Sequence, residues 1–157
     1  MSRGSFAVGV PMLWALGGVA VLVLAEVENI AVSALISNGR LLHDTYYVVS
    51  HRGYAIGLAA AFGVFAGWYY LFPKVTGWSY SRLLGKVHFW LTFFGVTAGA
   101  VPLVLALAYM EPGMVDVPDP FRYANLASRI GAYVAAGGIA VFFVNMALAF
   151  WRRRPAS

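Results

Sequence analysis

Long uncharged stretches alternate with short charged segments along this sequence. Four uncharged runs cover residues 4–25, 53–73, 87–110 and 130–151. A bilayer core of roughly 30 Å needs about 20 helical residues, and a helix satisfies its own backbone hydrogen bonds where no water is present. The pattern therefore predicts four transmembrane helices, at about residues 6–27, 45–72, 85–110 and 127–151, forming a single domain over residues 1–157. We expect the first run to be a span and not a cleaved signal peptide, because it is longer than an ordinary signal-peptide core.

The composition agrees with an all-α, polytopic membrane protein. Hydrophobic residues make up 61% of the chain and charged residues 11%, whereas a soluble domain carries about 25% charged residues. This balance excludes a disordered chain, a nucleic-acid-binding module and most cytosolic enzymes. Cysteine is absent, so metal chemistry would have to use histidines and carboxylates.

The distribution of charge predicts the orientation of the chain in the membrane. With a cytoplasmic N-terminus, all six acidic residues fall on the outer side and the basic residues concentrate on the inner side. The positive-inside rule then places both termini in the cytoplasm, consistent with a multi-pass protein of the bacterial inner membrane. We interpret the basic tail 152–154 as a topological anchor, and we expect lipid contacts and no nucleic-acid partner. The inner basic residues are Arg3, Lys74, Arg82, Lys86, Arg152, Arg153 and Arg154, and the outer ones are Arg40, Arg52, Arg122 and Arg129.

A short amphipathic segment, residues 26–37, follows the first span. Its apolar residues recur at helical spacing, so it either lies on the outer membrane surface or extends the first helix, and Asn38-Gly39 is expected to end it.

Small and aromatic residues suggest how the helices pack. Glycines spaced four apart permit close helix contacts, and the pairs 53/57, 63/67 and 95/99 predict that the second and third helices pack best. Aromatic residues at the ends of the spans, including Trp68 to Tyr70, indicate interfacial belts.

Two clusters could carry chemistry. His43 and Asp44 precede the second span, where they either belong to a helix start, with Asp44 or Thr45 as the cap, or ligate a divalent ion. His51 and Arg52 lie about two turns further on, where His51 is a candidate axial heme ligand and Arg52 a candidate partner for a heme propionate. The alternative is an ordinary hydrogen-bonded or hydrated histidine. His88 begins the third span on the opposite side, so a heme held by His51 and His88 together is not expected.

The motif LHDTYYVV, residues 42–49, is followed by His51 and Tyr54. Together with FAGWYYLFPKVTGWSYSRLLGKVHFWLTFFGV, residues 65–96, it resembles the passage from the tenth to the eleventh helix of the catalytic subunit I of heme-copper cytochrome c oxidases. VDVPDPF, residues 115–121, extends the similarity more weakly. The resemblance covers helices nine to twelve, the C-terminal third of that subunit.

The resemblance also implies which cofactor ligands are retained. The family's HFH motif corresponds here to His51-Arg52-Gly53, so the ligand of the high-spin heme is kept and that of the low-spin heme is missing. The family's arginine pair aligns with Pro112-Gly113, whereas His43 and Asp44 match positions of its magnesium site. The copper ligands belong to helices outside the region of similarity. Oxygen reduction by this chain alone is therefore not expected.

Two functional hypotheses follow. The first is a noncatalytic, oxidase-subunit-I-like membrane subunit or assembly partner of a respiratory or other bioenergetic complex, with no cofactor required. The alternative is a heme-binding electron-transfer or sensor protein that uses His51 as an axial ligand.

Overall fold

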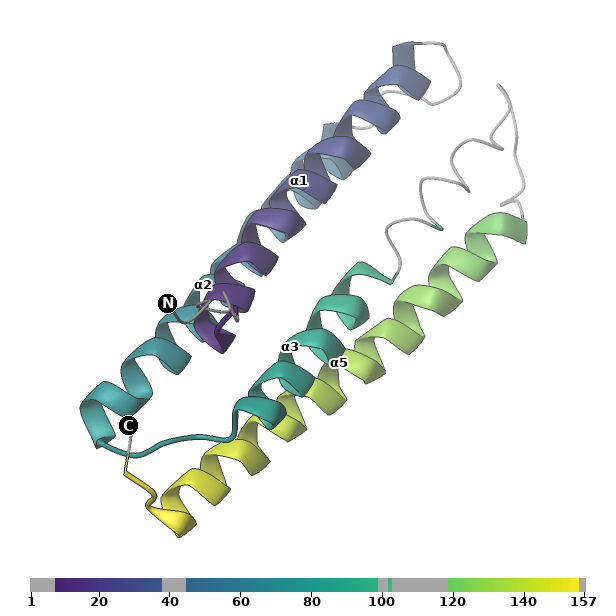
Figure 1. The fold of residues 1–157 in the computed structure, drawn as a ribbon. Coiled ribbons are helices and arrows are strands. Elements are labelled where there is room, and N and C mark those ends of the chain that lie inside the picture. The colour runs from purple at the N-terminus through teal and green to yellow at the C-terminus, as the bar shows by residue number, and fades with distance from the viewer. Residues whose placement is uncertain (1–7, 38–44, 99–101, 103–118, 156–157) are drawn as a thin grey trace, which may run out of the picture.

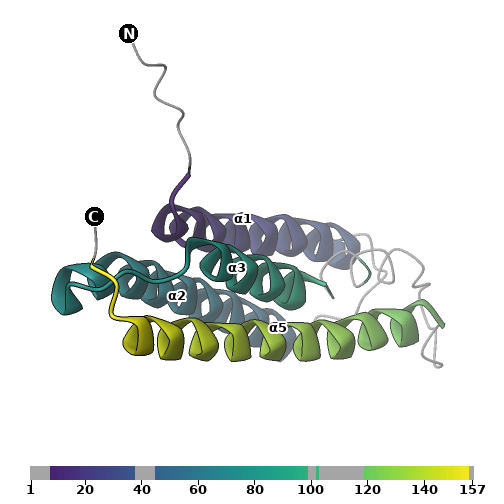
Figure 2. The ribbon, with the colours of Figure 1, turned by 60° about the horizontal axis from the view of Figure 1, so that its bottom comes forward.

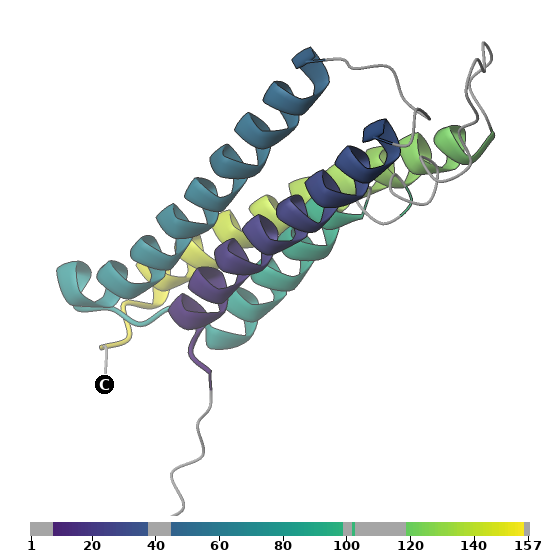
Figure 3. The ribbon, with the colours of Figure 1, turned by 90° about the horizontal axis from the view of Figure 1, so that it is seen from above.

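The structure is a computed structural model that describes residues 8–37, 45–98, 102 and 119–155. Within these residues it is all-α, and four helices run alongside one another (Figure 1). They alternate in direction, so the start of α1 and the end of α5 lie at the same end of the bundle (Figure 3). The helices are α1 (Val10–Ser37), α2 (Thr45–Thr76), α3 (Arg82–Thr97) and α5 (Asp119–Arg152).

Three of these helices have the length and composition to cross a membrane. The apolar stretches are Val10–Ala31, Gly53–Thr76 and Arg122–Arg152, which match the first, second and fourth predicted spans. The third predicted span, 85–110, extends past the described part of α3, so it stays a prediction. The amphipathic segment continues α1 to Ser37 without a break, which is the second of the two arrangements expected for it. Asn38 and Gly39 lie outside the described residues.

The extension of α1 has an unusual distribution of polar and apolar side chains. Val27 and Ile30 are 56% and 68% exposed, whereas Glu28 is buried. A helix end in water would show the reverse pattern, because exposed apolar area is unfavourable there. The exposed Val27 and Ile30 suit contact with lipid or another apolar partner, whereas the exposed Glu26 marks a polar side of the same segment.

The turn between α2 and α3 is specified by local hydrogen bonds. Gly77 adopts a φ of +72°, which glycine tolerates without steric cost, and its N–H donates to the carbonyl of Pro73 at 3.0 Å. Ser81 then caps α3 by accepting the N–H of Leu84 at 3.4 Å. The tight turn brings α3 back along the bundle.

The helices pack mainly as two pairs, α1 with α2 and α3 with α5. Glycines allow α3 and α5 to pack closely along their seam. A Cβ added at Gly95 would lie 2.6 Å from the carbonyl oxygen of Gly131, and one added at Gly138 would lie 2.6 Å from Thr92 Oγ1. The prediction for Gly95 is thus confirmed, while its partner Gly99 lies outside the described residues. Backbones can approach this closely only where side chains are absent.

The packing prediction for the second helix is wrong. A Cβ added at Gly53, Gly57, Gly63 or Gly67 would meet nothing within 4 Å, so these glycines point away from the other described helices. The close contact between α1 and α2 comes instead from Gly17 and Gly18 of α1, which lie against Phe62 and the carbonyl of Ala59. Spacing identifies a smooth helix face, but it does not say which neighbour covers that face.

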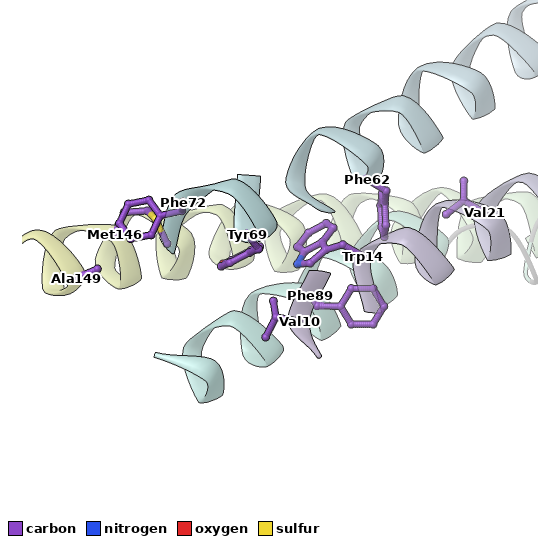
Figure 4. Close-up of a cluster of buried hydrophobic side chains, with 9 residues drawn as sticks. All are labelled: Val10, Trp14, Val21, Phe62, Tyr69, Phe72, Phe89, Met146 and Ala149. Atoms are coloured by element: carbon purple, nitrogen blue, oxygen red, sulfur yellow. The ribbon is translucent and has the colours of Figure 1, made fainter. Parts of the chain in front are cut away.

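The core lies toward the end of the bundle that holds the start of α1 and the end of α5. Figure 4 shows its side chains converging from all four helices. Trp14 is central, with ring centroids 4.9 Å from Phe62 and 5.4 Å from Phe89. Because lipid offers helices no hydrophobic reason to associate, interlocking rings of this kind supply the contact energy. The buried cluster comprises Val10, Trp14, Val21, Phe62, Tyr69, Phe72, Phe89, Met146 and Ala149.

Candidate functional site

The residues singled out by sequence are only partly described. His51 and Arg52 lie in the second turn of α2, at the end of the bundle where α1 stops and α5 begins. Their side chains, together with His43 and Asp44, lie outside the described part of the structure. The heme and divalent-ion hypotheses for these residues therefore stay predictions.

His88 of α3 is the centre of a buried polar cluster at the other end of the bundle. Its side chain is 0% exposed, and its Nδ1 lies 3.0 Å from the hydroxyl of Tyr69 in α2, which is also 0% exposed. Tyr69 was expected in an interfacial belt, and this part of the prediction is wrong. Its neighbours Trp68 and Tyr70 are 46% and 53% exposed and do lie on the outside.

Asn145 of α5 extends the cluster to the fourth helix and to the turn before α3. Its Oδ1 accepts the backbone N–H of Ser81 at 2.9 Å, and its Nδ2 donates to the Ser81 carbonyl at 3.2 Å. Its side chain also lies close enough to the Tyr69 hydroxyl to interact with it. Two hydrogen-bonded pairs, His88 with Tyr69 and Asn145 with Ser81, thus lie next to each other and join α3 to α2 and α5 to the turn before α3. Such interhelical bonds stabilise membrane bundles because the unpaired groups would be costly in hydrocarbon.

Aromatic rings surround the imidazole of His88 on its remaining sides. The centroid distances are 4.5 Å to Trp14, 4.7 Å to Phe65 and 5.2 Å to Phe142. Within the described residues, His88 Nε2 and Trp14 Nε1 are buried without a hydrogen-bond partner. A porphyrin could not reach Nε2 without displacing these rings, so His88 does not fit a heme ligand. The cluster is built for packing and hydrogen bonding between helices.

His51 and His88 are far apart, as expected from sequence. His88 is held against Tyr69, which lies 18 positions after His51 on α2. At 1.5 Å per residue the two α2 positions are about 27 Å apart, nearly the thickness of a bilayer core. The structure therefore separates the His51 end of the bundle from the His88 cluster.

Sequence reasoning did not find the role of His88, although a signal was present. Asn145 is a polar residue inside the uncharged run 130–151, and a buried amide in a span must find a partner within the protein. The four residues form two pairs that are far apart in the chain, with 64 positions between Ser81 and Asn145 and 19 between Tyr69 and His88. Only the folded chain reveals that they meet.

Most of the sequence matches known proteins. The family model described as cytochrome c and quinol oxidase polypeptide I matches residues 1–134. Cytochrome c oxidase subunit 1 of Cereibacter sphaeroides is 37% identical over 147 residues, which are 93% of this chain and 26% of the relative. The chain thus spans about a quarter of the length of the curated relative it matches.

Proposed function

This chain belongs to the cytochrome c and quinol oxidase polypeptide I family, and we propose that it acts as a noncatalytic membrane subunit or assembly partner of a respiratory or other bioenergetic complex. The described helices make it an oxidase-subunit-I-like, multi-pass membrane protein. The proposal assigns it a docking role within a larger assembly, with no oxygen chemistry of its own.

The outward face of α2 is the observation that carries this proposal. Gly53, Gly57 and Gly63 line that face with open space above each Cα, and Ile56 and Val64 beside them are 58% and 68% exposed. Small residues let a second helix approach its backbone closely, which is how membrane helices associate. We infer that a partner helix packs here. The resemblance implies that Gly53 corresponds to the family's second histidine, and a glycine at that position suits helix contact.

We further propose four spans with both termini in the cytoplasm, in one domain over residues 1–157 of the bacterial inner membrane. The third span would continue α3 to about residue 110. The four helices among the described residues put the start of α1 and the end of α5 at the same end of the bundle, and the collection of Lys74, Arg82 and the tail 152–154 at that end supports a cytoplasmic location for it.

Copurification tests the docking role. A tagged chain is extracted from native membranes in mild detergent, crosslinked, and analysed by native electrophoresis with mass spectrometry of the bands. We expect comigration with subunits of an electron-transfer complex. A chain that migrates only as a free monomer, with no crosslinked partner, would refute the proposal.

Two matched glycine variants locate the docking face. Gly57→Leu fills the open space on α2, whereas Gly137→Leu fills equally open space on α5. We expect Gly57→Leu to release the partner and Gly137→Leu to retain it, because only the first obstructs the proposed helix contact. Equal behaviour of the two variants would contradict docking through α2.

The alternative heme function predicts a different result from the same preparation. A purified chain with a Soret band that His51→Ala abolishes would replace the docking proposal by a heme protein. Retention of the partner by a chain without heme absorbance would support the docking role.

A further inference from the structure

Basic side chains from three separate segments meet at one end of the bundle. We name this group the basic end. All six members are exposed, and the carboxylates Glu26 and Glu28 lie in the opposite half of α1. The helix dipoles contribute little net charge here, because two helices start and two end at this level. The side chains therefore dominate its electrostatics. The basic end consists of Lys74 of α2, Arg82 and Lys86 of α3, and Arg152, Arg153 and Arg154 at the end of α5.

The C-terminal tail is fastened to the turn between α2 and α3. Ser79 donates its backbone N–H to the carbonyl of Arg154 at 2.8 Å, and Trp78 pairs with Pro155 in an isolated bridge. Figure 2 shows the tail crossing from the end of α5 to this turn. Arg153 adopts a φ of 41°, which reverses the chain, and its guanidinium lies 5.3 Å from the centroid of the Trp78 ring. The tail arginines are thus held against the turn that leads into α3, which begins at Arg82.

Exposed apolar side chains lie among these charges. Val75, Leu83 and Trp151 are 80%, 72% and 87% exposed. An exposed tryptophan next to arginines is typical of the level where hydrocarbon meets headgroups. A nucleic acid or a soluble acidic protein would leave these apolar groups uncovered, whereas a phospholipid offers acyl chains to them and phosphate to the charges.

We propose that the basic end binds the headgroups of anionic phospholipids, with Arg153 and Arg154 as its principal contacts. Arginine forms bidentate hydrogen bonds with phosphate, and the fastened tail presents its charges with little further ordering. An anionic leaflet attracts each nearby basic residue enough for roughly a fivefold gain in affinity per charge. The inference is independent of the docking role proposed above.

Lipid binding to the purified full chain tests the proposal. The probes are dioleoyl phosphatidylglycerol and dioleoyl phosphatidylcholine in neutral detergent micelles, with retained lipid counted by native mass spectrometry. We expect preferential retention of phosphatidylglycerol, weakened by salt because the contacts are exposed. Equal retention of the two lipids would overturn the proposal, as would displacement of phosphatidylglycerol by an equal concentration of inorganic phosphate.

Matched double variants assign the binding to the tail. Arg153→Gln/Arg154→Gln removes two charges from the basic end, and Arg122→Gln/Arg129→Gln removes two exposed charges from the other half of α5. We expect roughly a 10- to 25-fold loss of phosphatidylglycerol affinity in the first and little change in the second. Arg153→Lys/Arg154→Lys keeps the charge and should recover most of the affinity. Unchanged affinity in the tail glutamine variant would refute the assignment.

Discussion

Replacing Tyr69 with phenylalanine removes one hydroxyl from the centre of the bundle and leaves the ring in place. In the structure that hydroxyl lies 3.0 Å from Nδ1 of His88, and both side chains are 0% exposed. The substitution leaves a buried imidazole nitrogen without this partner.

The expected cost follows from this geometry. An unsatisfied buried polar group costs about 1–3 kcal/mol in soluble proteins, and interhelical hydrogen bonds in membrane proteins average about 0.6 kcal/mol with a maximum near 1.7. We therefore expect Tyr69→Phe to lower the free energy of unfolding by about 1–2 kcal/mol. Tyr70→Phe is the matched control, because the hydroxyl of Tyr70 meets Lys74 at an exposed site; its effect should stay within about 0.5 kcal/mol.

A double-mutant cycle in mixed micelles measures the bond itself. Unfolding is followed by tryptophan fluorescence on titration with sodium dodecyl sulfate, with Trp14 as a reporter whose ring centroid lies 4.5 Å from that of His88. Tyr69→Phe/His88→Leu should cost less than the two single variants together, by about 0.5–1.5 kcal/mol, because removing both partners leaves no orphaned group. Additive costs, or an equal loss in Tyr70→Phe, would refute the role assigned to the buried bond.

Three further outcomes are expected. Gly95→Ala should lower the free energy of unfolding by about 1–3 kcal/mol, because its Cβ would meet backbone atoms between α3 and α5. Gly63→Ala, which faces open space, should be neutral or slightly stabilising. Equal effects of the two variants in unfolding titrations would contradict this packing. Asn145→Leu should lower the free energy of unfolding by about 1–3 kcal/mol, since Ser81 loses both bonds to the amide. Burial raises the pKa of Tyr80, in the turn before α3, with a smaller opposing effect from Arg82. The stability that Tyr80 contributes is therefore fully present below its ordinary pKa near 10 and is lost as the pH rises through the raised value. Ultraviolet titration of tyrosinate should show late ionisation of Tyr80, and Tyr80→Phe should abolish that part of the alkaline destabilisation.

Sequence reasoning succeeded where a single chemical constraint dominates. The uncharged runs predict helices because a backbone in hydrocarbon must satisfy its own hydrogen bonds, and three apolar helices of sufficient length occur at the predicted places. The family could also be identified from the sequence, because LHDTYYVV and the stretch from Phe65 to Val96 are long, specific matches to oxidase subunit I. Sequence reasoning failed at the glycines of α2, because their spacing identifies a smooth helix face but does not show whether a neighbouring helix lies against it.

The sequence alone therefore determines that this protein lies in a membrane, where its apolar runs are, and that it is related to oxidase subunit I. Tertiary structure decided which faces meet. It brought His88, Tyr69 and Asn145 into one buried cluster, turned the α2 glycines outward, and fastened the arginine tail to the turn before α3. The physical reason is that membrane composition depends on each residue's own transfer energy, whereas helix pairing depends on contacts between residues far apart in the chain.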